Sequence, residues 1–280
     1  MIQIIFTTKK EADCMLYLLC ECGQKKRDTI FLERETMITC YSNEWPRFIH
    51  DILIPSLIQF FAQIKEPQLL LSIIKEKFYF TDEDEQQQIL HIAQSIIEGE
   101  RDEIPKVKSF EPRDEFLYSA FNSFLHPDLS FNMDSFIIFR LSKYLKRLTE
   151  YAEISIEEYK LEQEYQNFIQ SLRDYVMQNT PKHKTLHILH DYSYFFIFNE
   201  EWRKMSYSEL KKYIDRDFIY RHPMYIDSQL LAPLVSIAPL KIFLYTDQQD
   251  EGMIQTIINI FQERVTIYSK DVFDDQKVSF

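Results

Sequence analysis

A long stretch of this chain, from Pro127 to Pro181, contains neither glycine nor proline between its ends, which favours long helices over a sheet with tight turns. The pattern predicts two helices here, at roughly 134–150 and 156–178. Ser155 and the glutamate three residues after it stand at capping-box spacing, which favours a break or kink over one continuous helix. The second helix carries an apolar stripe with alternating spacings of four and three, and we expect it to pack against a neighbour: Leu161, Tyr165, Phe168, Leu172 and Tyr175.

The N-terminal part of the chain begins with a predicted strand at 2–6 and continues into a helix. Thr8 and Glu11 stand at capping-box spacing, and Gly23 is placed to end this helix. Residues 29–41 are rich in β-compatible side chains, so they predict one or two strands.

The region 45–99 follows a helical pattern, and its clearest helix begins after Thr81 and ends at Gly99. The segment 98–112 has mixed charge, two prolines and few apolar residues, so we expect a surface linker and a domain boundary there. The clearest helix has one apolar face, formed by Ile89, Leu90, Ala93, Ile96 and Ile97.

After Pro181 the hydrophobic period changes to two, which indicates strands. The elements expected there are a hairpin of strands at 186–190 and 194–198, a helix opened by a capping box at Ser206 and Glu209, and strands at 242–245 and 265–268 on either side of a helix at 253–261.

Together these elements predict an α+β fold, with mostly helical N-terminal and central parts, a small mixed sheet, and a C-terminal α+β part. We divide the chain into a strand–helix start with a helical region at 1–104, a central helical hairpin at 105–180, and a C-terminal α+β region at 181–280. The last two parts are expected either to stay separate or to pack as one compact unit.

The charge of the chain is acidic, with 44 Asp and Glu against 32 Lys and Arg and a formal net charge of -12. Binding to a nucleic-acid backbone needs clustered basic residues, so we expect no nucleic-acid partner. The first residues lack the pattern of a signal peptide, and the apolar stretches 52–64 and 230–240 are too short or too interrupted to span a bilayer. We therefore expect a cytoplasmic protein without a transmembrane segment.

Glycine is scarce, and the three glycines, Gly23, Gly99 and Gly252, stand far apart. A P-loop, a dinucleotide-binding turn and a nucleophile elbow each need at least two glycines within a few residues. The sequence therefore excludes these three motifs and predicts no cofactor, although nucleotide binding by another route stays open.

Histidines are the next candidates for a metal or acid–base site, because His183, His187, His190 and Asp191 lie close in sequence. On a strand, His187 and His190 point to opposite faces, and His183 lies about 13 Å from His187 at ~3.3 Å per residue. The sequence therefore predicts surface or packed histidines here. The alternative is a site completed by His222 and Asp227.

Cysteines and glutamates give no metal motif either. The cysteine spacing, C-x5-C-x-C-x17-C, lacks the paired C-x2-C of zinc sites, and the acidic helix lacks the E-x-x-H motif of di-iron sites. We expect no metal, buried cysteines, and an acidic helix face that complements a basic one in a helix hairpin. The residues in question are Cys14, Cys20, Cys22 and Cys40, the acidic Glu157, Glu158, Glu162 and Glu164, and the basic Arg140, Lys143, Lys146 and Arg147.

Several idiosyncratic motifs lie in the middle and C-terminal parts: Phe139-Arg140-Leu141 with Tyr144, Glu162 to Ile169 with Leu172-Arg173, Leu186-His187-Ile188, Ile226-Asp227-Ser228, and Pro233 to Pro239. In these motifs, in length and in layout, the chain resembles the YtxC-like family of sporulation proteins from endospore-forming bacteria. The resemblance implies a sporulation context, but it implies no reaction and supplies no catalytic residue.

Two functions follow from these observations. The first is a non-enzymatic interaction or scaffold protein that acts in sporulation with a protein partner. The missing catalytic motifs, the aromatic helical stripe and the apolar segment 230–239, which suits either a core or a binding surface, all favour it. The oligomeric state stays open.

The alternative function is an enzyme or small-ligand-binding protein with a polar site between the central helices and the C-terminal α+β part. Each residue of this site also has a structural interpretation as a buried hydrogen bond or a helix cap. The candidates are Arg140 as an anion clamp, Glu164 and Tyr165 as positioning groups, and Asp227, Ser228 and Ser236 as pocket groups.

Overall fold

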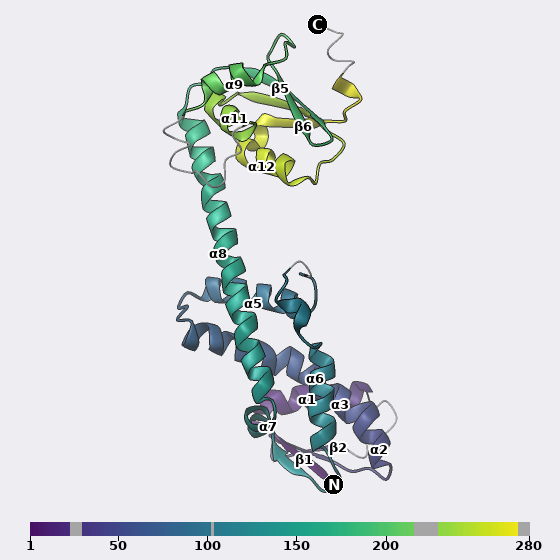
Figure 1. Cartoon of the computed structure of the whole chain (residues 1–280). Helices are drawn as coiled ribbons and strands as arrows, with labels where there is room; N and C mark the ends of the chain where they lie inside the picture. The colour runs from purple at the N-terminus through teal and green to yellow at the C-terminus, as the bar shows by residue number, and fades with distance from the viewer. Residues whose placement is uncertain (23–29, 102–103, 216–228, 274–280) are drawn as a thin grey trace. The chain divides into compact units, whose positions relative to one another are not determined.

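The chain forms two compact units, Met1–Lys160 and Leu161–Phe280, which we call the N-unit and the C-unit. Each unit combines helices with a four-stranded sheet, so the predicted α+β fold is confirmed (Figure 1). The computed structural model describes residues 1–22, 30–101, 104–215 and 229–273.

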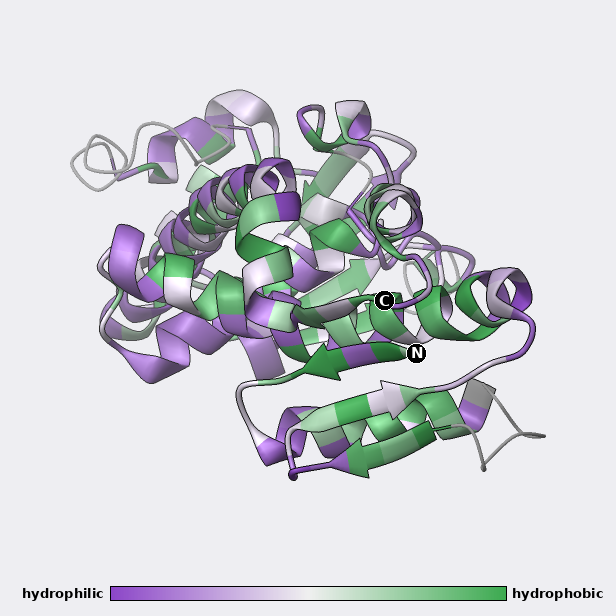
Figure 2. Ribbon diagram, turned by 90° about the horizontal axis from the view of Figure 1, so that it is seen from below, coloured by the Kyte–Doolittle hydropathy of each residue, from purple (hydrophilic) through white to green (hydrophobic). Residues whose placement is uncertain are grey.

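The sheet of the N-unit has the strand order β2-β3-β1-β4, with β1 antiparallel to β3 and parallel to β4. The predicted strands at 2–6 and 29–41 are confirmed, and the second region forms a hairpin that turns at Arg34 and Glu35, both with positive φ. The alternate residues Ile2 and Ile4 are fully buried, and Figure 2 shows the strand at the N-terminus as mostly hydrophobic. The strands are β1 Ile2–Ile5, β2 Ile30–Glu33, β3 Met37–Cys40 and β4 Ser130–Asn132.

The helices of the N-unit pack on this sheet and on one another around a shared apolar core. The predicted helix after Thr81 is confirmed, and it begins with an Asp82 carboxylate that accepts a hydrogen bond from the Glu85 N–H at 2.9 Å. The α-helices are α1 Lys9–Cys22, α2 Trp45–Phe48, α3 Ile54–Phe60, α4 Glu66–Ser72, α5 Glu83–Ile97, α6 Arg113–Phe124 and α7 Met133–Arg140.

Three π-helical segments interrupt the run from α2 to the residues before α5, namely η2 Ile49–Leu53, η3 Phe61–Lys65 and η4 Ile73–Lys77. Pro55 lies just after η2, and Pro67 lies just after η3. Proline has no N–H to donate and clashes with the carbonyl one turn earlier, so a wider turn before it lets the helix continue. The prolines therefore account for two of the three π segments.

Helix α8, Ser142–Gln178, is one continuous helix of 37 residues, so the predicted break at Ser155 is wrong. The Ser155 hydroxyl donates to the Tyr151 carbonyl at 2.7 Å, one turn back within the helix, and therefore caps nothing. The actual break is at Leu141, between α7 and α8.

The helix hairpin predicted from opposite charges is also wrong, because Lys143, Lys146 and Arg147 and all four glutamates follow one another along the single helix α8, while Arg140 ends α7. Two of these residues have partners in other segments of the N-unit instead. Arg147 donates to the Glu111 carbonyl at 2.5 Å, and Glu157 lies 3.8 Å from Lys106.

The segment 98–112, predicted as a surface linker, is anchored to the N-unit. Ile104 is only 9% exposed, and the Phe110 ring packs edge-to-face on Tyr151 with 5.0 Å between centroids. These apolar residues are too few to produce a periodic pattern, yet each one docks on the core. The compact units divide inside α8, between Lys160 and Leu161, which differs from the predicted divisions at 104/105 and 180/181.

The C-unit contains a second sheet of order β6-β5-β7-β8, in which β5, β7 and β8 are parallel and β6 pairs antiparallel with β5. The predicted hairpin and the capping box of Ser206 and Glu209 are confirmed. The elements are β5 Thr185–Asp191, β6 Tyr194–Phe198, α9 Tyr207–Tyr213, α11 Leu231–Ile237, β7 Lys241–Tyr245, α12 Gly252–Phe261 and β8 Val265–Tyr268.

Helix α11 lies in the apolar segment 230–239, for which the sequence allows either a place in the core or a binding surface. All seven residues from Leu231 to Ile237 are buried, so this part of the segment belongs to the core. None of the helices that the structure describes is long and apolar enough to cross a membrane.

Candidate functional site

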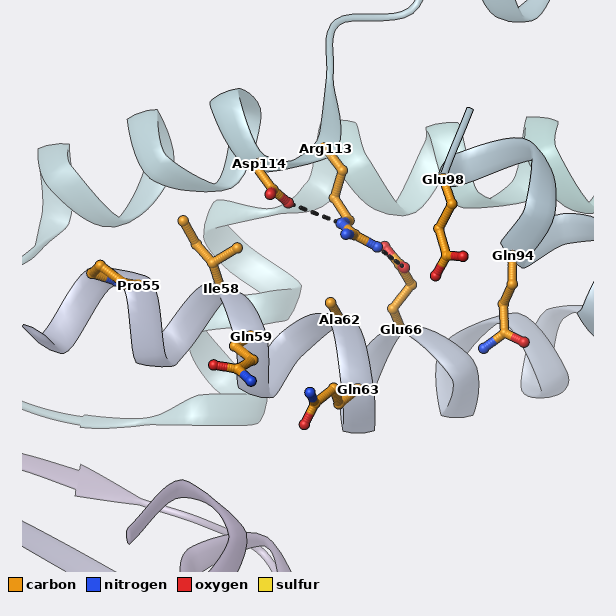
Figure 3. Close-up of a pocket in the computed structure, with 10 residues that line it drawn as sticks. All are labelled: Pro55, Ile58, Gln59, Ala62, Gln63, Glu66, Gln94, Glu98, Arg113 and Asp114. Carbon is orange, nitrogen blue, oxygen red and sulfur yellow. Dashed lines mark hydrogen bonds and ion pairs between the residues drawn. The ribbon is translucent and has the colours of Figure 1, made fainter. Parts of the chain in front are cut away.

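A cavity of about 480 Å³ opens in the N-unit beside the helical run that contains η3, and we call it the Glu66 cavity (Figure 3). Its walls combine apolar side chains, amides and charged groups, which is typical of small-molecule sites. The lining residues are Pro55, Ile58, Gln59, Ala62, Gln63, Glu66, Gln94, Glu98, Arg113 and Asp114.

Glu66 is the buried charge of this cavity, with a residue exposure of 2%. One carboxylate oxygen accepts a hydrogen bond from the Tyr144 hydroxyl, and the other lies 3.3 Å from Nη1 of Arg113. Burial raises the pKa of Glu66, while Tyr144 and Arg113 act in the opposite direction. Arg113 also donates from Nε to Asp114 at 3.0 Å, so its guanidinium bridges two carboxylates.

Two consecutive charged residues are buried where η3 ends and α4 begins, namely Lys65 and Glu66. Lys65 lies 2.6 Å from both Glu11 and Asp134, and Thr7 donates to the second of these carboxylates. The Lys65 amine therefore bridges two carboxylates near the ends of the parallel strands β1 and β4, where α1 and α7 begin. Both charges have local partners, as buried ions require.

The chemistry that this arrangement can support is binding of a positive group. No histidine, cysteine, serine or threonine is among the lining residues, so the cavity wall offers no hydroxyl, thiol or imidazole nucleophile. Three carboxylates, from Glu66, Glu98 and Asp114, face a single guanidinium from Arg113.

The predicted candidate site residues fall in separate surroundings. Arg140 is exposed at the end of α7, with its guanidinium carbon 5.4 Å from the centroid of the Phe124 ring. Glu164 is exposed on α8, and the hydroxyl of its neighbour Tyr165 lies 3.3 Å from that of Thr256. The buried Ser236 hydroxyl accepts a hydrogen bond from the Asp215 N–H at 3.1 Å, as the structural interpretation expects.

Asp227 and Ser228 lie outside the described residues, as do His222 and Gly23. Arg140 belongs to the N-unit, whereas Glu164, Tyr165 and Ser236 belong to the C-unit. The six-residue site therefore stays a prediction.

The histidines of β5 are packed in the C-unit. His187 is 6% exposed, stacks on Trp202 with 3.9 Å between centroids, and lies 3.1 Å from the Tyr245 hydroxyl. Burial lowers the pKa of His187 to about 4. Such a histidine is neutral at pH 7.

His190 lies 2.9 Å from the Thr246 hydroxyl through Nδ1 and 3.4 Å from Glu251 through Nε2. The order hydroxyl, imidazole, carboxylate is that of a catalytic triad. Thr246 is only 1% exposed, however, and its hydroxyl also accepts the Gln248 N–H at 3.0 Å. A substrate cannot reach this hydroxyl, and the 3.4 Å contact between His190 Nε2 and Glu251 is not a hydrogen bond, so the three groups do not form a catalytic triad.

The described residues contain no group of three or more His, Cys, Asp or Glu side chains placed to hold a metal ion. Cys40 is buried, Cys14 and Cys20 are partly buried, and all three are free thiols. Burial raises the pKa of Cys40 to about 12, which suits a packed thiol rather than a nucleophile.

A second notable feature is a surface at the junction of α7 and α8, which we call the α7–α8 patch. Ile138 and Phe139 are consecutive large apolar residues with exposures of 60% and 78%. Three exposed basic residues follow within seven positions, and none of them takes part in an ion pair with another described residue: Arg140, Lys143 and Lys146.

The sequence reasoning missed Glu66, Arg113 and Tyr144 as a group. The available signal was a Lys-Glu pair in the middle of an otherwise apolar helical region, because such charges are rarely buried without partners. The partners of Glu66 lie 47 and 78 positions further along the chain, which no local pattern can indicate.

Two sequence comparisons with known proteins point to the same family. The sequence model of the YtxC-like family matches residues 51–266. A protein of Bacillus subtilis (strain 168) with the name "Uncharacterized protein YtxC" is 43% identical over 283 residues, covering 99% of this chain and 98% of that protein. No solved structure matches the chain. The extent of both sequence matches shows that this chain belongs to the YtxC-like family.

Proposed function

We propose that this chain is a non-enzymatic interaction protein of the cytoplasm that acts during sporulation, and that it binds an acidic protein partner through the α7–α8 patch. The observation that carries the proposal is the exposure of Ile138 and Phe139 beside three basic residues that form no ion pair with another described residue. Adjacent exposed apolar side chains with a charged rim are typical of protein–protein contacts.

The charge of the patch gives the kind of partner. The whole chain carries a formal charge of -12, yet the segment from Arg140 to Arg147 contains four basic residues and no acidic one. A local reversal of charge on an acidic protein attracts an acidic surface and steers its approach. The sporulation setting and the absence of a reaction come from the family resemblance and from the missing catalytic motifs.

The test uses Bacillus subtilis cells in which this chain replaces its relative. A photo-crosslinking amino acid is placed at Phe139, and the matched control places it at Tyr79, which is 81% exposed in the same unit. We expect a discrete crosslinked protein from position 139 during sporulation, and its loss when Arg140, Lys143 and Lys146 are all changed to glutamate.

Heat-resistant spore counts supply the second measurement. The charge-reversed variant should lower the spore count as a deletion does. Identical crosslinks from positions 79 and 139, or normal spore counts in both the variant and the deletion strain, contradict the proposal.

The alternative, an enzyme or ligand site built from Arg140, Glu164, Tyr165, Asp227, Ser228 and Ser236, requires residues of both units to converge. The Ser236 hydroxyl already has the Asp215 N–H as a hydrogen-bond partner, which supports a structural role. We therefore favour the interaction function.

A further inference from the structure

We propose that the Glu66 cavity binds an aliphatic polyamine, that is, a linear methylene chain with an ammonium group at each end. This site is separate from the α7–α8 patch, and the inference does not depend on the proposed interaction function.

The charge of the cavity wall favours a cation. Arg113 is the one basic residue of the lining, and its guanidinium is engaged by Glu66 at 3.3 Å and by Asp114 at 3.0 Å. Glu98, by contrast, is exposed and has no ion pair with any residue that the structure describes. Three carboxylates and one guanidinium leave two negative charges in excess.

The placement of these charges suits two ammonium groups rather than one. Figure 3 shows Asp114 on one side of Arg113 and Glu98 on the other, while Glu66 points toward Arg113 from below. A ligand with one charge at each end can meet Glu98 and Asp114 together, each through a charge-assisted hydrogen bond. Because Arg113 lies between these two carboxylates in Figure 3, an ammonium group placed at one of them leaves the other without that cation.

The rest of the wall matches a methylene chain with polar ends. Ile58, Ala62 and Pro55 give the cavity an apolar side, against which CH₂ groups lose contact with water. Side-chain amides accept hydrogen bonds from ammonium groups, and the lining supplies three of them, from Gln59, Gln63 and Gln94.

Other ligand classes fit this wall less well. An anion would meet three carboxylates and a guanidinium whose two edges already serve Glu66 and Asp114. A tightly held divalent ion needs several converging oxygen ligands, and the described residues form no such acidic group.

The test is isothermal titration calorimetry on the full chain at about 150 mM salt, where long-range attraction is screened beyond roughly 8 Å. The two probes are butane-1,4-diamine and butylamine, which share a chain length and differ by one ammonium group. The butylamine arm also represents the single ammonium of a lysine side chain from another protein. We expect the diamine to bind about tenfold more tightly, as one more hydrogen bond to a charged group provides.

Four variants complete the experiment. Glu98→Gln and Asp114→Asn each remove one carboxylate of the wall, so each should abolish the preference for the diamine. The controls are Glu100→Gln and Glu115→Gln, which neutralise exposed carboxylates near the cavity but outside its lining and should keep the preference.

Four results overturn the proposal. The first is no binding of the diamine to the unmodified chain. The second is a preference that survives in both Glu98→Gln and Asp114→Asn, and the third is an equal loss in all four variants, which indicates diffuse attraction to an acidic protein. Equal binding of both amines by the unmodified chain assigns the cavity to single ammonium groups and also contradicts it.

Discussion

A proline at position 157 tests whether α8 is continuous, because it separates two interpretations of Ser155. In a helix that begins after Ser155, residue 157 lies in the first turn, where the N–H has no helical partner and proline is tolerated. In the continuous helix, Glu157→Pro removes a hydrogen bond to the carbonyl of residue 153 and pushes the ring into that turn. The expected cost is about 3 kcal/mol or more.

The lost side chain adds little to this cost. Glu157 and Lys106 are 68% and 69% exposed and 3.8 Å apart, so their ion pair is a weak surface contact. For a unit the size of the N-unit, about 3 kcal/mol lowers the melting temperature by roughly 6–12 °C.

The assay is thermal unfolding followed by circular dichroism, with Glu157→Ala as the matched control. The alanine variant should melt within about 2 °C of the unmodified chain, because alanine is the best helix former. Hydrogen exchange should show loss of amide protection around residue 157 only in the proline variant. A proline variant that melts together with the alanine variant, and keeps that protection, refutes the continuous helix.

Three further predictions concern buried polar groups. Tyr144→Phe removes a hydrogen bond to the buried Glu66 carboxylate, so it should lower the free energy of unfolding in urea by about 1.5–3 kcal/mol. Adding Glu66→Gln should recover part of this loss. An unchanged unfolding midpoint in Tyr144→Phe contradicts the network. Lys65→Met leaves Glu11 and Asp134 without their cation and should lower the free energy of unfolding by about 3–5 kcal/mol. The loss should be smaller when Asp134→Asn is added. A double variant that is less stable than Lys65→Met alone contradicts this reasoning. His187 has a pKa of about 4 when folded against an ordinary value of 6.5, so the unfolded chain takes up the proton first and stability falls as pH drops from about 6.5 toward 4. The expected loss in the free energy of unfolding at pH 5 is about 2 kcal/mol. If His187→Gln loses the same stability between pH 7 and pH 5 as the unmodified chain, groups other than His187 cause the loss.

The sequence predicted correctly the elements whose structure depends on residues that are near one another in the chain. The hairpin of β5 and β6 follows from its period-two pattern, and α9 follows from Ser206 and Glu209, whose hydrogen bonds both form. The same Ser-x-x-Glu spacing failed at Ser155, because a capping box needs free N–H groups at a helix start. Inside α8 these groups are already bonded, and the serine hydroxyl turns back to Tyr151.

The Glu66 cavity was beyond local prediction for a different reason. Its pairing depends on where α6 and α8 place Arg113 and Tyr144 against α4, which is a property of the tertiary fold. The sequence analysis proposed Arg140 as an anion clamp, and the structure places this residue on an exposed surface next to Ile138 and Phe139.

The adjacent buried charges Lys65 and Glu66 also bear on how the N-unit selects one packing. An ordinary helix offers many rotations that bury an apolar face, whereas these two charges must meet Glu11 with Asp134 on one side and Arg113 with Tyr144 on the other. Any other rotation or shift leaves a charge buried without a partner, at a cost of several kcal/mol. Buried ion pairs add little net stability compared with apolar residues of the same volume, so their effect is to penalise the wrong arrangements. Because the same contacts hold Arg113 between Glu66 and Asp114, the network that selects the packing also sets the charge pattern of the cavity wall.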